Sequence, residues 1–147
     1  MNNQEKINYL KQYRSLNMEI DRISEELHRW QDLATRISPS YSDMPHGGGG
    51  DKVQTAAVEI AELTDRLNEK IHRAVKMQQE IKELIGTIDD ATLRRLMTYR
   101  YILGKKWEEI AMLMNYDYRW ILRLHGKALY KLDEHAIKSH YNPMILL

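Results

Sequence analysis

The stretch "KINYLKQYRSLNMEIDRISEELHRWQDLATRI", residues 6–37, carries the heptad pattern that decides how this chain can fold. Residues alternately three and four positions apart are apolar or aromatic, with Lys6 as the exception, and mostly charged or amide residues lie between them. This spacing is typical of a helix that packs along a narrow seam against another helix. The seam positions are Lys6, Tyr9, Tyr13, Leu16, Ile20, Ile23, Leu27, Trp30, Ala34 and Ile37.

The same spacing returns between residues 53 and 84, where only Lys70 breaks the apolar pattern. Two helices are therefore expected, over about residues 3–37 and 51–85, each roughly 50 Å long. Because their lengths and seams match, we expect an antiparallel hairpin over residues 1–86, with Asp51 as the N-cap of its second helix. One seam buries little, so the rest of the chain or a second copy, in a homodimer, is expected to cover the hairpin. The second seam consists of Val53, Ala56, Ile60, Leu63, Leu67, Lys70, Ala74, Met77, Ile81 and Leu84.

The bend of the hairpin falls in a proline- and glycine-rich stretch, "PSYSDMPHGGGGDK", residues 39–52. Its glycines do not form a Walker phosphate loop, because Asp51-Lys52-Val53 follows them in place of Lys-Ser or Lys-Thr, and a helix precedes them. The bend over residues 38–50 is longer than the roughly 2–8 residues that join two helices. It is therefore either a tolerated flexible turn or a partner-contact site, with Tyr41, Asp43 and Met44 at its tip.

Shorter helical units replace the long heptads in residues 87–135. There "WEEIAMLMNYDYRWILRLHGKALYKL", residues 107–132, combines a short helix, a tight turn at residues 115–117 and a second helix that Asp117 can cap. The helix before this motif is expected to start with Thr87 or Asp89 as its cap and to end at Gly104. The second helix of the motif has Ile121, Leu124, Ala128 and Leu132 facing inward and Arg119, Arg123, Lys127 and Tyr130 facing outward. This is the helix-turn-helix plan, whose second helix enters the major groove of DNA.

Local charge favours a nucleic-acid partner more than the total charge does. The formal net charge of the 147 residues is +1. Residues 94–131 nevertheless hold nine Lys and Arg against three acids, whereas residues 1–87 hold 12 against 14. Arginine can bond O6 and N7 of guanine together, and lysine suits phosphates. The alternative is a small helical bundle whose solvated face happens to be basic.

Residues 107–132 resemble the DNA-binding half of region four of sigma-70-type sigma factors. The similar features are the "EEIA" start, the "NYD" turn and the "KALYKL" ending, which fall into register without a gap. The resemblance implies recognition of a −35 promoter element and contact with the flap of RNA polymerase. This sequence departs from the family at Tyr118, Trp120 and Gly126, so the recognised DNA sequence does not carry over.

The whole chain is similar to small phage and prophage proteins of Gram-positive bacteria, related in plan to the ArpU- and RinA-type regulators of late phage genes. The proline-glycine loop and the stretch from "YILGKKWEEIA" to "HGKALYKL" carry this similarity. It implies a transcription regulator. No segment resembles the promoter-melting part of a sigma factor, so an activator acting with host RNA polymerase is favoured. The alternatives are a helical adaptor that binds polymerase or another regulator without reading DNA, and a DNA-packaging accessory of small-terminase type.

Together these features predict an all-α protein with double-stranded DNA as its partner. The residues assigned to base reading are Tyr118, Arg119, Trp120 and Arg123. The residues assigned to phosphate contacts are Lys105, Lys106, Lys127, Lys131 and Tyr130.

Catalysis, metal binding and a cofactor are not expected. The chain has no cysteine, and His135 and His140 are five apart, off the spacing that places two ligands on one helical face. No carboxylate pair or Ser-His-Asp grouping lies in a context that would bury and tune it. The remaining histidines are expected at the surface or facing DNA, and they are His28, His46, His72 and His125.

A cytoplasmic location in a bacterial host is expected, without membrane insertion. The start "MNNQEKINYLKQY" lacks the apolar core of a signal peptide, and no stretch approaches the roughly 20 apolar residues that cross a bilayer. Residues 136–147 form a tail whose apolar "PMILL" ending favours docking over fraying.

Overall fold

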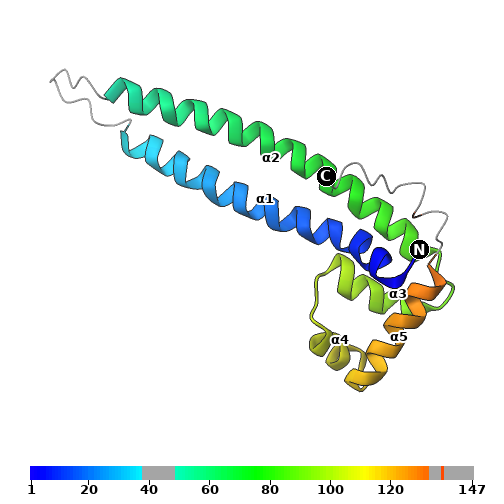
Figure 1. The fold of residues 1–147 in the computed structure, drawn as a ribbon. Helices are drawn as coiled ribbons and strands as arrows, with labels where there is room; N and C mark the ends of the chain where they lie inside the picture. Colours follow the sequence, from blue (N-terminus) through cyan, green and yellow to red (C-terminus); the bar gives the residue numbers. More distant parts are fainter. Residues whose placement is uncertain (38–48, 133–136, 138–147) are drawn as a thin grey trace. The chain divides into compact units, whose positions relative to one another are not determined.

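The computed structural model describes residues 1–37, 49–132 and 137. Two long helices, α1 (Asn3–Ile37) and α2 (Gly49–Gly86), precede a group of short ones (Figure 1). The short elements are α3 (Ala91–Met97), a π-helical turn η1 (Thr98–Ile102), α4 (Trp107–Met114) and α5 (Tyr118–Lys131). Within the described residues there are helices and no strand, which confirms the predicted all-α class.

The chain forms two compact units that do not follow the predicted boundary at residue 86. The first unit joins Met1–Ser15 to Ala74–Leu147, and the second is Leu16–Arg73. The start of α1 and the end of α2 therefore belong to the same unit as α3, η1, α4 and α5. The predicted segments 1–86, 87–135 and 136–147 are each continuous in sequence, whereas the first compact unit combines two stretches that are distant in sequence.

The heptad seams form the less exposed face of both long helices. All ten positions of the second seam except Val53 are buried or half-buried, and so are the positions of the first seam from Lys6 to Ala34. The prediction for Val53 is wrong, because its side chain is 47 % exposed near the start of α2. Lys70, the break in the second seam, forms an ion pair across the second unit with Glu19, at 3.0 Å between Nζ and Oε2. Its charge is thus compensated by a carboxylate of α1.

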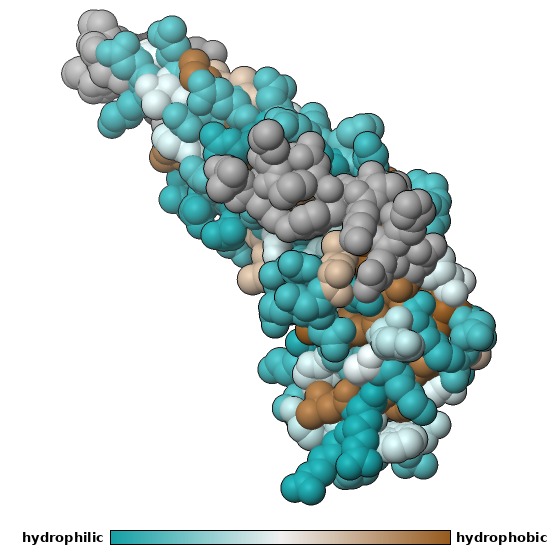
Figure 2. All heavy atoms as spheres, turned by 45° about the vertical axis from the view of Figure 1, so that its right-hand side comes forward, coloured by the Kyte–Doolittle hydropathy of each residue, from teal (hydrophilic) through white to brown (hydrophobic). Residues whose placement is uncertain are grey.

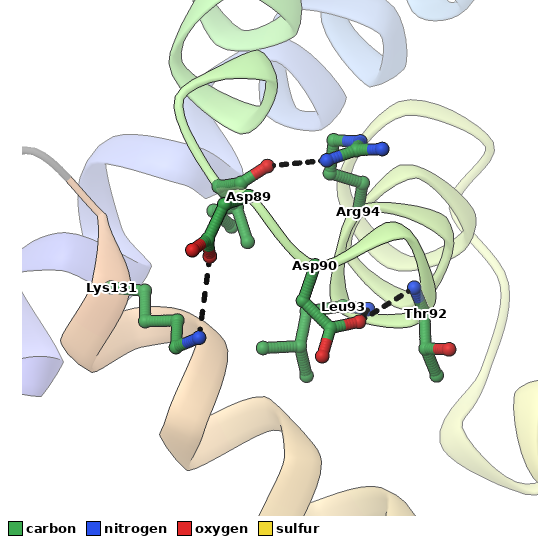
Figure 3. Close-up of polar contacts among 7 residues, drawn as sticks. Asp89, Asp90, Thr92, Leu93, Arg94 and Lys131 are labelled. Atoms are coloured by element: carbon green, nitrogen blue, oxygen red, sulfur yellow. Dashed lines mark hydrogen bonds and ion pairs between the residues drawn. The ribbon is translucent and has the colours of Figure 1, made fainter.

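Two predicted helix caps differ from the observed ones. Because α2 begins at Gly49, Asp51 lies in its first turn, where a negative charge still favours the helix dipole, and is not the N-cap. The N-cap of α3 is Asp90, in place of the expected Thr87 or Asp89 (Figure 3). Its Oδ1 accepts hydrogen bonds from the backbone N–H groups of Thr92, at 2.8 Å, and Leu93, at 3.2 Å. Asp90 prevails because it immediately precedes the first helical residue, where an acceptor reaches these donors.

Left-handed backbone ends the helical segments on either side of α4. Gly104, with a φ of 68°, follows η1 as the sequence predicts, and Asn115, with a φ of 56°, is the C-cap of α4. Asp117 occupies the N-cap position of α5 in extended conformation, without a side-chain capping hydrogen bond. The connection between α4 and α5 is therefore the short turn that residues 115–117 predict.

The core of the first unit draws side chains from all of its helices. α3 packs against η1 and α5, and α4 packs against α5. Residues near the start of α1 and the end of α2 join this cluster, so the short helices do not enclose it by themselves. The most completely buried members include Leu10, Ile81, Ile88, Leu96, Met97, Ile110 and Ile121.

Candidate nucleic-acid interface

Helix α5 has one buried face and one exposed basic face. Ile121, Leu124, Ala128 and Leu129 are buried in the core of the first unit. The opposite face carries polar and charged side chains. These residues share one face because they are spaced three and four positions apart along the helix. Its exposed members are Arg119, Arg123, Lys127 and Tyr130. Tyr130 has the largest exposed fraction among the large apolar and aromatic residues of the described chain, at 85 %.

All four residues assigned to base reading are exposed. Tyr118 and Trp120 flank Arg119 in the first turn of α5, and both rings are exposed to nearly half of their area. Arg123 follows one helical turn later. Two guanidinium groups and two aromatic rings therefore lie on the N-terminal half of the helix. This is the part that reaches base edges when such a helix lies in a major groove.

The lysines assigned to phosphates differ in their surroundings. Lys127 on α5 and Lys106, the N-cap of α4, are exposed, whereas Lys105 is half-buried. Lys131 pairs with Asp89, at 3.3 Å between Nζ and Oδ1 (Figure 3). The hydrogen bond from Lys131, together with its charge, lowers the pKa of the Asp89 carboxyl. Lys131 is therefore partly compensated by the chain itself, and Lys127 and Lys106 are better placed to bind an anion.

A hollow of about 440 Å³ lies between α3 and α5, next to these cations. Lys127, Tyr130 and Lys131 contribute its polar wall on α5, and Leu124 contributes an apolar part. Asp90 and Leu93 close it from the side of α3. The hollow is open to solvent. Lys127, Tyr130 and Lys131 can donate hydrogen bonds to phosphate oxygens there, whereas Leu93 and Leu124 are apolar and Asp90 is an acceptor.

His125 is half-buried and belongs to an aromatic cluster with Tyr101 and Trp107, so the expectation that it lies at the surface or faces DNA is wrong. Its Nε2 is 2.7 Å from the hydroxyl of Tyr101, and its ring centroid is 4.5 Å from that of Trp107. Arg100 stacks over Trp107 at 4.5 Å and donates a hydrogen bond to the carbonyl of Lys105. The sequence gives no sign of this cluster, because its members come from η1, α4 and α5.

The ring of His125 is neutral at physiological pH. Burial, followed by the charges of Arg100 and Lys11, lowers its pKa to about 4. Burial also raises the pKa of the Tyr101 hydroxyl, which therefore keeps its proton and can donate it to Nε2. The cluster joins α5 to α4 through the packing of His125 against Trp107, and to η1 through the hydrogen bond between Tyr101 and His125.

Two residues of α1 reach the elements around α5. The buried ammonium of Lys6 donates a 2.8 Å hydrogen bond to the backbone carbonyl of Leu129, in the last turn of α5. A cation at this end of a helix is favoured by the exposed carbonyls. The guanidinium of Arg14 lies against Gly104, in the space that a Cβ there would occupy. From the sequence, Lys6 is only a position that interrupts the apolar seam. The carbonyl that accepts its hydrogen bond belongs to Leu129, 123 positions later in the chain.

Comparisons of the chain with protein-family models, with curated proteins and with solved structures each find no match. Within residues 1–37, 49–132 and 137, no helix has the length and apolar character that crossing a membrane requires. The same residues contain no group of three or more His, Cys, Asp or Glu that could hold a metal ion. The predicted partner-contact residues Tyr41, Asp43 and Met44 lie outside the described residues, as do His46, His135 and His140.

Proposed function

We propose that this protein is a sequence-specific DNA-binding transcription regulator of phage or prophage genes. The observation that carries the proposal is the exposed face of α5, on which Arg119, Arg123 and Lys127 stand one turn apart above a buried apolar face. No described acid other than Asp117 lies on this helix or at its N-terminal cap. A helix with such a face suits an anionic groove.

In this proposal α4 and α5 form a helix-turn-helix, with α5 as the recognition helix. A short first helix, a turn with left-handed Asn115 and a 14-residue second helix are the dimensions that this motif needs. At 1.5 Å per residue α5 is about 21 Å long, enough to lie along a major groove. The resemblance of residues 107–132 to region four of sigma factors supports the same reading.

The residues of α5 would divide the work of recognition. Arg119 and Arg123 would bond guanine edges through their planar forks, with Tyr118 and Trp120 packing beside them. Lys127, Tyr130 and Lys106 would contact phosphates, with lesser contributions from Lys105 and Lys131. Phosphate contacts fix the register of the helix on the duplex, and the arginines supply the preference for a sequence.

The two long helices would serve as an antiparallel hairpin for dimerisation or for contact with host RNA polymerase. Ile71 and Val75 widen the apolar stripe of α2 and are exposed in the chain by itself. A dimer would place two copies of α5 on one duplex, which raises affinity by multivalency. The resemblance to late-gene regulators favours an activator over a repressor.

Selection from a pool of random-sequence duplexes tests the proposal. The wild-type protein should enrich a common sequence, and its affinity should fall steeply as salt rises. Arg123→Ala should cost about 1–3 kcal/mol on the enriched duplex and flatten the preference, whereas Lys127→Ala should weaken all duplexes alike. Lys82→Ala, which removes an exposed lysine of α2, is the matched control and should bind like wild type. No enrichment and no salt-dependent binding by the wild-type protein would refute the proposal.

Exposed apolar side chains on α4 favour a second candidate, a helical adaptor that binds RNA polymerase without reading DNA. Met112 is 83 % exposed and Leu113 54 %, and apolar surface can be seen between hydrophilic groups in the part of Figure 2 that holds α3, α4 and α5. Such side chains suit a protein partner better than a phosphate backbone. Capture of purified host RNA polymerase by the wild-type protein, lost in Met112→Glu and unchanged in Arg123→Ala, would support the adaptor.

A further inference from the structure

Gly126 lies in the interior of α5, where glycine is the least favourable residue after proline. Its backbone does not need glycine, because Gly104 is the glycine with positive φ in the described residues. The helix therefore contains a destabilising residue at a position where any side chain with helical φ would fit the backbone.

Packing within the described chain does not require glycine at this position either. A Cβ built on Gly126 meets no described heavy atom within 4 Å. Gly104 shows the contrast, because a Cβ there would strike the guanidinium of Arg14 and its φ is 68°. One glycine is thus explained by the fold of this chain, and the other calls for an explanation outside it.

The position of Gly126 indicates what approaches it. Gly126 is half-buried and lies three residues after Arg123 and four before Tyr130, so it shares one face of α5 with these two exposed residues. It also lines the hollow formed by Lys127, Tyr130 and Lys131. On α5 the polar groups of this hollow are therefore two ammonium groups and a hydroxyl, which bind phosphate oxygens, and the carboxylate of Asp90 lies on the side of α3.

We propose that Gly126 is the point at which a sugar–phosphate strand of the bound duplex comes closest to the backbone of α5. The absence of a side chain lets the strand pass against the helix while Lys127 and Tyr130 reach phosphates on either side. The base readers occupy the N-terminal half of α5, so its C-terminal half, with Gly126, would run along the wall of the groove. This inference rests on the proposed DNA-binding function and adds a residue that sets how deeply the helix enters.

The substitution Gly126→Ala separates this role from a structural one, because the two predict opposite signs. Alanine should raise the melting temperature by about 2–4 °C, since it favours the helix and meets open space. It should also weaken duplex binding by about tenfold, the fold-change of an overpacked contact. The loss should be similar for the enriched duplex and for an unrelated duplex, because the strand carries no sequence information.

Gly86→Ala is the matched control, since Gly86 ends α2, is exposed and likewise has open space around its Cβ position. It should leave duplex binding unchanged. Unchanged affinity in Gly126→Ala would overturn the inference while leaving the proposed function intact. A lower melting temperature would also overturn it, by showing that the chain itself packs on Gly126. If the wild-type protein binds no duplex, the proposed function fails and the inference fails with it.

Discussion

His125 should make the free energy of unfolding depend on pH, because its ring packs against Trp107 and Tyr101 in the folded chain. An unfolded histidine has a pKa of about 6.5, and the folded value is about 4. Between these two values the unfolded chain binds more protons than the folded chain does. The free energy of unfolding therefore stays high above about pH 6.5 and falls as the pH drops toward 4. At about pH 4.5 the two pKa values imply a loss of about 2–3 kcal/mol relative to neutral pH.

Urea unfolding followed by circular dichroism, at about pH 7.5 and pH 4.5, measures this loss. His125→Gln keeps a hydrogen-bonding group for Tyr101 but cannot titrate, so its stability should fall by about 2 kcal/mol less than that of wild type over this range. His72→Gln makes the same change at an exposed histidine of α2 and is the matched control. It should retain the full wild-type pH dependence. Equal pH dependence in wild type and His125→Gln would refute the account of a buried, neutral ring.

Two further substitutions test contacts around α5. Asp89→Asn removes the carboxylate that pairs with Lys131, so it should strengthen binding to any duplex. The slope of log affinity against log salt should become steeper by about 0.9, the value for one added phosphate contact. Titrations at several salt concentrations measure both the affinity and the slope. Lys6→Met removes the buried donor to the carbonyl of Leu129 and should lower the free energy of unfolding by about 1–3 kcal/mol. The control Lys11→Met, at an exposed position, should change this free energy little. Urea unfolding measures both variants, and equal effects would mean that the hydrogen bond contributes nothing to stability.

Sequence periodicity predicted the local features well. Except for Val53, the described seam positions lie on the less exposed side of α1 and α2, and the predicted outward residues of α5 are exposed. Gly104 adopts the left-handed conformation expected after a helix. These features depend on residues within one or two helical turns of each other, and the spacing of apolar residues records that information directly.

The interactions that sequence reading missed join residues that are distant in the chain. Because His125 is isolated from other candidate ligands in the sequence, it is expected at the surface or facing DNA, but its surroundings come from η1, α4 and the charge of Lys11. Lys6 appeared to interrupt a seam, although it bonds the end of α5. A single sequence does not record which distant residue will supply a partner for a polar group. The cap of α3 was missed for another reason, since Thr87, Asp89 and Asp90 are all capable cap residues within one turn of chain.

The first unit is assembled from the beginning of the chain and from residues after position 73. On a ribosome the second unit, Leu16–Arg73, is contiguous and can close as soon as it emerges. The first fifteen residues must wait for the segment that follows, including Leu129, which bonds Lys6. At roughly 5–20 residues per second, the 123 residues between them take about 6–25 s to synthesise. Ile81 and Leu84 of α2 belong to the same core and are made earlier, so we expect Tyr9 and Leu10 to be covered in steps, with the contacts to α5 formed last.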